Sequence, residues 1–283
     1  MAYETLISVE ELRGLLQSGA GVLLLDCEFD LTAPEKGRQV YAAGHLPGAR
    51  YAHLDEDLAG RPDGTNGRHP LPDRETFAAW LRRLGLKRGQ QVVAYGSNGG
   101  AGAARAWWLL RWIGHREAAV LDGGKAAWTA AGLPLETGVP PQPQPGDFTA
   151  AEPLAGAPVS AAEVLADIGH GAAQVLDARD PARFRGDPNP LDPVSGHIPG
   201  ARNRFFRDNL DSEGRFLPAG ELAAEFNALL QGKPAVLQCG SGVTACHNAL
   251  AMEIAGLRGA RLYPGSWSEW ISDPARPVAT GEE

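Results

Sequence analysis

The chain is poor in cysteine, has no long apolar run and carries no excess of positive charge, and each of these absences excludes a class of protein. Three cysteines among 283 residues cannot form a full disulfide framework, and a reactive thiol survives best under reducing conditions, so we expect a cytoplasmic protein. No apolar stretch approaches the roughly 20 residues of a membrane helix, and residues 1–12 lack the segments of a secretion signal. A formal charge of -8 argues against general nucleic-acid binding. The sequence therefore predicts a soluble, unprocessed protein with neither membrane nor nucleic-acid partners.

The sequence contains an internal repeat. The motif Gly-His-Leu-Pro-Gly-Ala at 44–49 returns as Gly-His-Ile-Pro-Gly-Ala at 196–201, an offset of 152 positions. Helix-capping boxes of the form Ser-x-x-Glu begin at Ser8 and Ser160, with the same offset. A chain of 283 residues can bury two ordinary cores. We therefore expect two tandem domains that share one fold.

Composition marks the boundary between the two halves. Residues 138–158 contain six prolines and no periodic apolar pattern, which is typical of an extended linker. This places the first domain at 1–137 and the second at 159–283. The first half also holds extra residues in a loop rich in Gly and Pro, near 61–73.

Short apolar stretches alternate with helical patterns in each half, which indicates a mainly parallel sheet flanked by helices. The expected strands lie at 22–25, 92–95, 118–121, 175–176 and 235–238. The sequence thus predicts an α/β fold for both domains. Ligands of such sheets gather at the carboxyl ends of the strands.

Cys239 directly follows one of these strand ends. After a loop of small residues, apolar side chains recur at spacings of three and four, which predicts an amphipathic helix. These side chains belong to Val243, Cys246, Leu250, Ile254 and Leu257. The first N–H groups of a helix are unpaired and lie at the positive end of its dipole, so they favour both a thiolate and an anionic substrate. Cys239 is therefore the candidate nucleophile.

The small residues around the cysteine predict an anion site. Gly240 and Gly242 have no Cβ, so the loop can adopt positive φ angles and turn its amides inward. We expect the N–H groups of this loop, through Val243 and Thr244, to contact the anionic substrate.

The other two cysteines fit a structural role. Cys246 lies on the apolar stripe and Cys27 follows an apolar strand, and free cysteine is among the most buried residue types. In the first half, Gly96 occupies the position of the nucleophile. We expect this half to be structural and to form part of the cleft. Because it also carries the repeated histidine motif, His45 and His197 are expected to be structural too.

These features together resemble the rhodanese superfamily of sulfurtransferases. They are the repeated Gly-His-x-Pro-Gly-Ala motif, a nucleophile in the second domain only, and the run Cys-Gly-Ser-Gly-Val-Thr-Ala that starts at Cys239. The loop is similar to that of the 3-mercaptopyruvate sulfurtransferase branch. The resemblance covers nearly the whole chain and extends to 106–108, 121–124 and 265–270.

The resemblance implies a chemistry and a set of site residues. Cys239 would attack the sulfur of a small anionic donor, become a persulfide, and pass the sulfur to thioredoxin, a low-molecular-weight thiol or cyanide. Neither a metal nor an organic cofactor is implied. Ser241 matches a serine that relays a proton together with the cysteine and an aspartate of the first domain, here Asp57, and His69 matches an active-site histidine. Without the resemblance, Asp57 would fit a solvated loop acid and His69 a hydrogen-bonded loop histidine.

Evidence on the donor is divided. Arg183 aligns with the family arginine that binds the donor's anionic group, and a guanidinium suits a carboxylate through two parallel hydrogen bonds. The branch has a second arginine nine positions further on, where this chain has Asp192. The thiosulfate branch carries two cations after the cysteine, whereas this chain has Gly240 and Ser241. We therefore expect 3-mercaptopyruvate as the donor, with thiosulfate as the alternative.

Other function classes fit less well. A cysteine phosphatase needs an arginine six positions after the nucleophile, where this chain has Ala245. A thiol hydrolase needs a histidine base beside Cys239, for which His69 is the candidate. A non-catalytic rhodanese-like binding module usually lacks the cysteine. A zinc site at Cys239, Cys246 and His247 has no complete ligand set.

Overall fold

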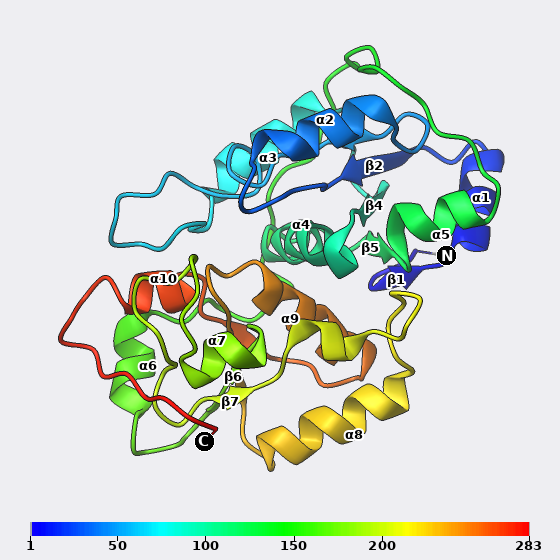
Figure 1. The fold of residues 1–283 in the computed structure, drawn as a ribbon. Coiled ribbons are helices and arrows are strands. Elements are labelled where there is room, and N and C mark those ends of the chain that lie inside the picture. Colours follow the sequence, from blue (N-terminus) through cyan, green and yellow to red (C-terminus); the bar gives the residue numbers. More distant parts are fainter. Residues whose placement is uncertain (1, 283) are drawn as a thin grey trace. The chain divides into compact units, whose positions relative to one another are not determined.

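The computed structural model describes residues 2–282, which form two compact units (Figure 1). The first unit comprises residues up to 60 together with 72–154 and 212–216. The second unit comprises 61–71, 155–211 and the residues from 217 onwards. The loop near 61–73 that the sequence shows as extra in the first half therefore packs mainly with the second unit.

The first unit contains a five-stranded sheet of order β1-β5-β4-β2-β3, in which every neighbouring pair is parallel. Its strands are β1 (Leu6–Ile7), β2 (Val22–Asp26), β3 (Arg50–Tyr51), β4 (Gln91–Tyr95) and β5 (Ala118–Leu121). Its helices are α1 (Val9–Gln17), α2 (Glu35–Ala43), α3 (Arg74–Arg83), η1 (Asn98–Gly100), α4 (Ala101–Trp112) and α5 (Gly124–Ala130). Right-handed crossovers in this strand order place α1 and α2 on one face and α3 and α4 on the other.

The second unit repeats this arrangement with a four-stranded parallel sheet of order β7-β6-β8-β9. Its strands are β6 (Gln174–Asp177), β7 (Arg202–Asn203), β8 (Ala235–Gln238) and β9 (Arg261–Leu262). Its helices are α6 (Ala161–Asp167), α7 (Pro181–Arg185), η2 (Phe206–Asn209), α8 (Ala219–Leu230), α9 (Thr244–Ile254) and α10 (Ser266–Trp270). The α/β prediction is confirmed. No helix within residues 2–282 is long and apolar enough to cross a membrane.

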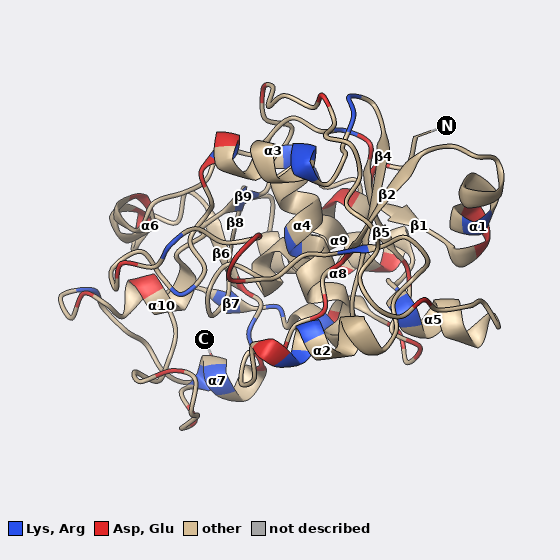
Figure 2. Ribbon diagram, turned by 90° about the horizontal axis from the view of Figure 1, so that it is seen from above, with Lys and Arg blue, Asp and Glu red and all other residues tan. Residues whose placement is uncertain are grey.

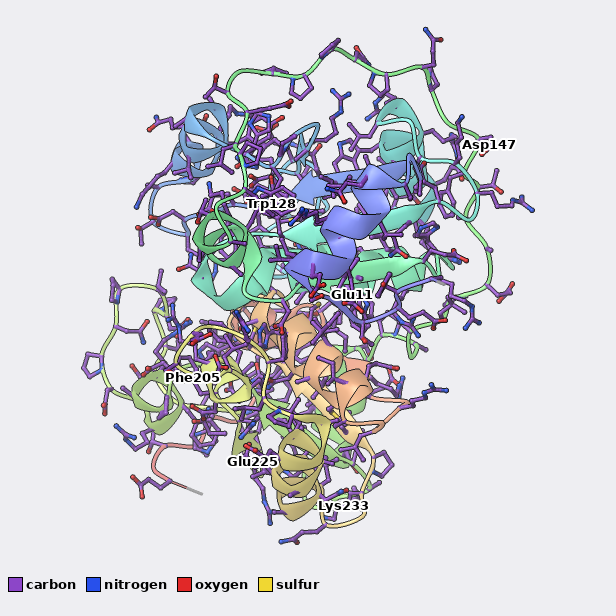
Figure 3. The ribbon with its side chains drawn as sticks, turned by 90° about the vertical axis from the view of Figure 1, so that its right-hand side faces the viewer. Glu11, Trp128, Asp147, Phe205, Glu225 and Lys233 are labelled. Carbon is purple, nitrogen blue, oxygen red and sulfur yellow. The ribbon has the colours of Figure 1, made fainter. Side chains whose placement is uncertain are left out.

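The duplication is visible in matching local contacts. Glu11, labelled in Figure 3, completes the predicted capping box at the start of α1, and the box that begins at Ser160 caps α6 in the same way. His45 and His197 are fully buried; each ring contacts a backbone carbonyl through Nδ1, at 2.9 and 2.8 Å, and stacks on an aromatic ring. These contacts support the structural interpretation of the two histidines.

The proline-rich segment between the halves has no regular structure but is hydrogen-bonded to the first unit. No helix or strand lies between α5 and α6. Phe148 and Ala151 donate their backbone N–H groups to carbonyls of Leu86 and Ile113, at 3.2 and 2.9 Å. These bonds fix the second part of the segment along the first unit.

The helix after Cys239 differs from the expectation. It ends at Ile254, so Leu257 lies beyond it. Residues 245–252 are all buried, because α9 packs against β8, α8 and η2. The polar side chain of Asn248 accepts a hydrogen bond of 2.7 Å from Asn209 of η2. The prediction of an amphipathic helix is wrong because the polar face finds its partners inside the protein.

One pair of equivalent carboxylates has diverged between the two units. Asp26 ends β2 and Asp177 ends β6, and both are fully buried. Two residues further on, the second unit has Arg179, whose guanidinium lies 2.7 Å from the Asp177 carboxylate. The first unit has Glu28 at that position in place of an arginine. Burial raises the pKa of Asp26 to about 6, although the charge of Lys125 acts in the opposite direction.

We expect Asp26→Asn to remove a pH dependence of stability. The Asp26 carboxyl keeps its proton in the folded state up to about pH 6, whereas the unfolded state releases it near pH 4. The neutral carboxyl therefore stabilises the fold fully below pH 4, and this stabilisation is lost as pH rises through 6. Between pH 4 and 7 the wild-type protein should therefore lose about 2 to 3 kcal/mol of unfolding free energy relative to Asp26→Asn. Urea unfolding of both proteins measures this, with Asp147→Asn at an exposed carboxylate (Figure 3) as the control. A difference that does not change with pH would contradict the assignment.

Candidate active site

Cys239 lies in a loop between β8 and α9, and three hydrogen bonds tie the backbone of this loop to the start of α10. The Cys239 N–H donates to Ser266 Oγ at 3.1 Å, and the Cys239 carbonyl accepts from Trp267 N at 2.9 Å. The Gly240 carbonyl accepts from Ser268 N at 3.0 Å. Only 2% of Cys239 is exposed. The loop is thus held from two sides, by the sheet and by α10.

The loop turns one amide directly onto the sulfur. The Gly242 N–H lies 3.1 Å from Cys239 Sγ, so it can stabilise negative charge there. Gly242 takes a φ of +78°, and a Cβ at this position would lie 2.3 Å from the Pro264 carbonyl oxygen. Only glycine fits at this position. The amides of Gly240, Val243 and Thr244, which immediately flank this contact, stay predicted contacts for a substrate anion.

His69 and Ser241 lie in contact, although 172 positions separate them. His69 Nδ1 is 2.7 Å from Ser241 Oγ, and both side chains are buried. Gly67 makes this approach possible, because a Cβ there would lie 2.6 Å from the Gly265 carbonyl oxygen. The loop 61–71 therefore brings His69 into the second unit beside the nucleophile loop.

Asp57 belongs to the first unit. Its carboxylate accepts a hydrogen bond of 2.8 Å from the His53 backbone N–H. Burial raises the pKa of Asp57, while this hydrogen bond lowers it. Its part in a proton relay with Cys239 stays a prediction.

Arg183 forms a two-pronged ion pair with Asp192. Its Nε and Nη2 groups each lie 2.8 Å from a carboxylate oxygen of Asp192. Arg183 comes from α7, where the basic residues are blue in Figure 2. Burial alone would raise the pKa of Asp192, but the hydrogen bonds from Arg183 and the charges of Arg179 and Arg68 outweigh it and lower the pKa. Asp192 is therefore the counter-ion of an arginine cluster.

The structure adds three residues that the sequence interpretation missed: Arg68, Arg179 and Ser266. The Arg68 guanidinium reaches the Leu191 carbonyl at 3.0 Å and lies 3.7 Å from Asp192. Arg179 is buried between Asp177 and Asp192 and lies over the Trp267 ring at 4.6 Å. Arg68 adjoins His69 and Ser266 lies in the segment 265–270, so both positions carried a signal in the sequence. For Arg179 the sequence carried no signal except its position just after a strand end.

Comparisons with known proteins agree with this geometry. The model of the rhodanese-like domain matches residues 8–131 and 160–273. The chain belongs to the rhodanese-like family. It is 50% identical over 287 residues to a Pseudomonas aeruginosa protein named a probable 3-mercaptopyruvate sulfurtransferase, covering 100% of both chains. It is 41% identical over 284 residues to a Mycobacterium tuberculosis protein provisionally named a thiosulfate sulfurtransferase, covering 98% of each. The solved 3-mercaptopyruvate sulfurtransferase of Leishmania major matches 97% of this chain and 75% of its own, with 31% identity and a TM-score of 0.83.

The two rhodanese-like domains differ at the position of Cys239. Tyr95 pairs with Asp26 in the first sheet as Gln238 pairs with Asp177 in the second, so the next residues, Gly96 and Cys239, are equivalent. This confirms the sequence alignment of the two halves. The glycine-rich loop that follows Gly96 lines a cavity of about 400 Å³.

The remaining cysteines of this rhodanese-family chain are buried. Burial raises the pKa of Cys27 well above its usual value, and the neighbouring Asp26 adds to this. The Cys246 thiol donates a hydrogen bond of 3.3 Å to the Gly242 carbonyl, which ties the loop after Cys239 to α9. Both contacts support the structural interpretation.

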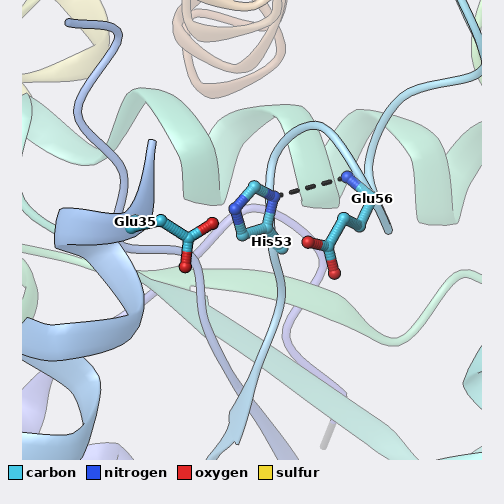
Figure 4. A group of neighbouring side chains, drawn as sticks. All are labelled: Glu35, His53 and Glu56. Carbon is cyan, nitrogen blue, oxygen red and sulfur yellow. Dashed lines mark hydrogen bonds between the residues drawn. The ribbon is translucent and has the colours of Figure 1, made fainter. Parts of the chain in front are cut away.

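Among residues 2–282, the one group of side chains close enough to share a metal ion is Glu35, His53 and Glu56 (Figure 4). His53 Nδ1 accepts backbone N–H groups from Asp55 and Glu56, at 3.1 and 3.4 Å. The proton of a neutral ring then lies on Nε2, which has no lone pair left for a cation. The cluster therefore does not fit a metal site, and its three residues belong to the first unit.

We expect Ser266→Ala to lower the unfolding free energy by about 1 to 3 kcal/mol, because it leaves the buried Cys239 N–H without its acceptor. Ser266 also takes a φ of +53°, so Ser266→Gly should lose about 1 kcal/mol less than the alanine variant. Urea unfolding measures both. Ser272→Ala is the matched control, since its hydroxyl bonds only the exposed Glu269 carbonyl. Equal stability of Ser266→Ala and Ser272→Ala would contradict the role of Ser266.

Proposed function

We propose that this rhodanese-family sulfurtransferase takes sulfur from 3-mercaptopyruvate onto Cys239 and passes it to a thiol acceptor. The observation that carries the proposal is the contact of the Gly242 N–H with Cys239 Sγ, within reach of a cluster of arginines. A thiolate and an anionic donor are both favoured in such surroundings. The name of the Pseudomonas relative supports the same donor.

The proposed first step needs no reactant other than the donor and Cys239, because all bonds, electrons and protons are accounted for by these two. The Cys239 thiolate attacks the donor sulfur; a sulfur–sulfur bond forms and the carbon–sulfur bond of the donor breaks. The carbon fragment leaves as the enolate of pyruvate and takes up the proton of the donor thiol. A persulfide anion remains on Cys239, where the Gly242 amide can stabilise it. A second thiolate, of thioredoxin or a small thiol, then attacks the outer sulfur and restores the cysteine.

His69 and Ser241 are the proposed proton carriers of this reaction. Their contact of 2.7 Å provides a path for a proton beside the nucleophile loop. We include Asp57 in the relay on the family resemblance alone. The same contact argues against the thiol hydrolase, since His69 Nδ1 is engaged with Ser241.

We expect Cys239→Ser to abolish sulfur transfer with no loss of fold, because a hydroxyl is a far weaker nucleophile and forms no persulfide. Cys27→Ser and Cys246→Ser should keep activity and serve as controls. Mass spectrometry after treatment with 3-mercaptopyruvate should show one added sulfur atom on the peptide that contains Cys239. Added sulfur on the peptide of Cys27 or Cys246 in its place would contradict the assignment. Absence of any added sulfur would favour the non-catalytic binding module.

The donor preference has a direct measurement. Because the loop after Cys239 has Gly240 and Ser241 where the thiosulfate branch carries two cations, kcat/KM for 3-mercaptopyruvate should exceed that for thiosulfate by about tenfold or more. Steady-state kinetics with cyanide as a common acceptor gives both values. A higher kcat/KM for thiosulfate would support the alternative activity, which the name of the Mycobacterium relative suggests for that protein.

A further inference from the structure

Two arginine side chains converge on one point beside the nucleophile. Nη2 of Arg68 and Nη2 of Arg183 each lie 2.9 Å from the position that a Cβ on Gly240 would take. The two nitrogens are therefore at most twice that distance apart, which a single carboxylate can bridge. Gly240 directly follows Cys239. The missing side chain of Gly240 thus leaves a space with a guanidinium nitrogen at each side.

The neighbouring charges make this space attractive to one anion. Asp192 lies 2.8 Å from Arg183 and 3.7 Å from Arg68, and Arg179 is shared between Asp192 and Asp177. Three guanidinium groups thus face two carboxylates, which leaves one positive charge among these five side chains. Both carboxylates are fully buried, whereas the side chains of Arg68 and Arg183 are 34% and 19% exposed. The exposed side of the cluster is therefore its cationic side.

Arg68 is held in this place by contacts that leave one end of its guanidinium group open. Its backbone N–H donates to Ser268 Oγ at 3.0 Å, and its Nη1 donates to the Leu191 carbonyl at 3.0 Å. Within residues 2–282, its Nη2 makes no hydrogen bond. Burial lowers the pKa of Arg68, and the negative charges of Asp192 and Cys239 act in the opposite direction.

We propose that Arg68 and Arg183 together bind the carboxylate of the sulfur donor beside Gly240. Arg68 thereby supplies the cation that position 192 lacks, and Asp192 positions both guanidinium groups for that contact. This inference rests on the proposed function, because it assigns a binding role toward a keto-acid donor. It makes the loop 61–71 a determinant of donor specificity, although this loop lies in the first half of the sequence.

The test is donor kinetics of Arg68→Ala and Arg68→Lys in the full chain. Loss of a charge-assisted hydrogen bond should raise KM for 3-mercaptopyruvate about ten- to a hundredfold in Arg68→Ala. The change in kcat should be smaller, because the carboxylate is bound equally before and during the attack on sulfur. Arg68→Lys should lie between, since an ammonium group keeps the charge but not the planar geometry. Arg185→Ala, an exposed cation on the same helix as Arg183, is the control and should keep the wild-type KM.

A second readout separates binding from a structural role. The persulfide is formed at saturating donor and freed of excess donor, and its sulfur is then transferred to an uncharged thiol such as dithiothreitol. Arg68→Ala should perform this half-reaction at the wild-type rate, because no carboxylate is involved. If both half-reactions slow together, Arg68 only supports the loop and the inference is wrong. If Cys239 gains no sulfur even in the wild-type protein, the proposed function fails instead.

Gly240→Ala tests the same space without removing a charge. Its Cβ would lie closer to both guanidinium nitrogens than real contacts allow, so both must move. We expect KM for 3-mercaptopyruvate to rise, and the rise should be smaller when Gly240→Ala is made in Arg68→Ala. An unchanged KM in both Arg68→Ala and Gly240→Ala would overturn the proposal.

Discussion

The buried carboxylate of Asp192 organises the site around Cys239. It contacts Arg183 through two hydrogen bonds and lies within 3.7 Å of Arg68 and Arg179. Without it, three guanidinium groups would repel one another in a partly buried place, and burying unpaired charge is costly. The residue that first looked like the loss of a substrate ligand is thus the one that holds the remaining cations in position.

The nucleophile loop has a second, independent set of constraints. Ser266 and Gly242 fix the backbone and the sulfur of Cys239, and Cys246 bonds the loop from within α9. The contacts of Cys246 and Ser266 come from α9 and α10, which both follow the loop in the sequence. A loop fixed in this way can direct an amide at the sulfur without rearrangement, which favours electrostatic stabilisation of negative charge there.

The two rhodanese-like domains show how one fold diverges after duplication. Both keep the strand-end aspartates Asp26 and Asp177, but Glu28 replaces the arginine that neutralises the second one. Both keep the strand end that precedes the nucleophile, but Gly96 replaces the cysteine. The first domain has the same kind of sheet without the arginine or the thiol, because the sheet depends on burial of apolar side chains and not on either polar group.

The sequence alone determined the α/β fold, the duplication and the strand that ends before Cys239. These follow from periodicity and repeated motifs, which act over a few neighbouring residues. It misjudged α9, whose polar face is covered by α8 and η2, because burial of that face depends on distant elements. Only the tertiary structure decided that the loop 61–71 packs with the second unit and brings Arg68 and His69 to Ser241 and Gly240. The sequence showed Asp192 only as the absence of a second arginine, and the structure shows it as the counter-ion of three arginines. A sequence gives the sign of a charge but not the opposite charges that it will contact.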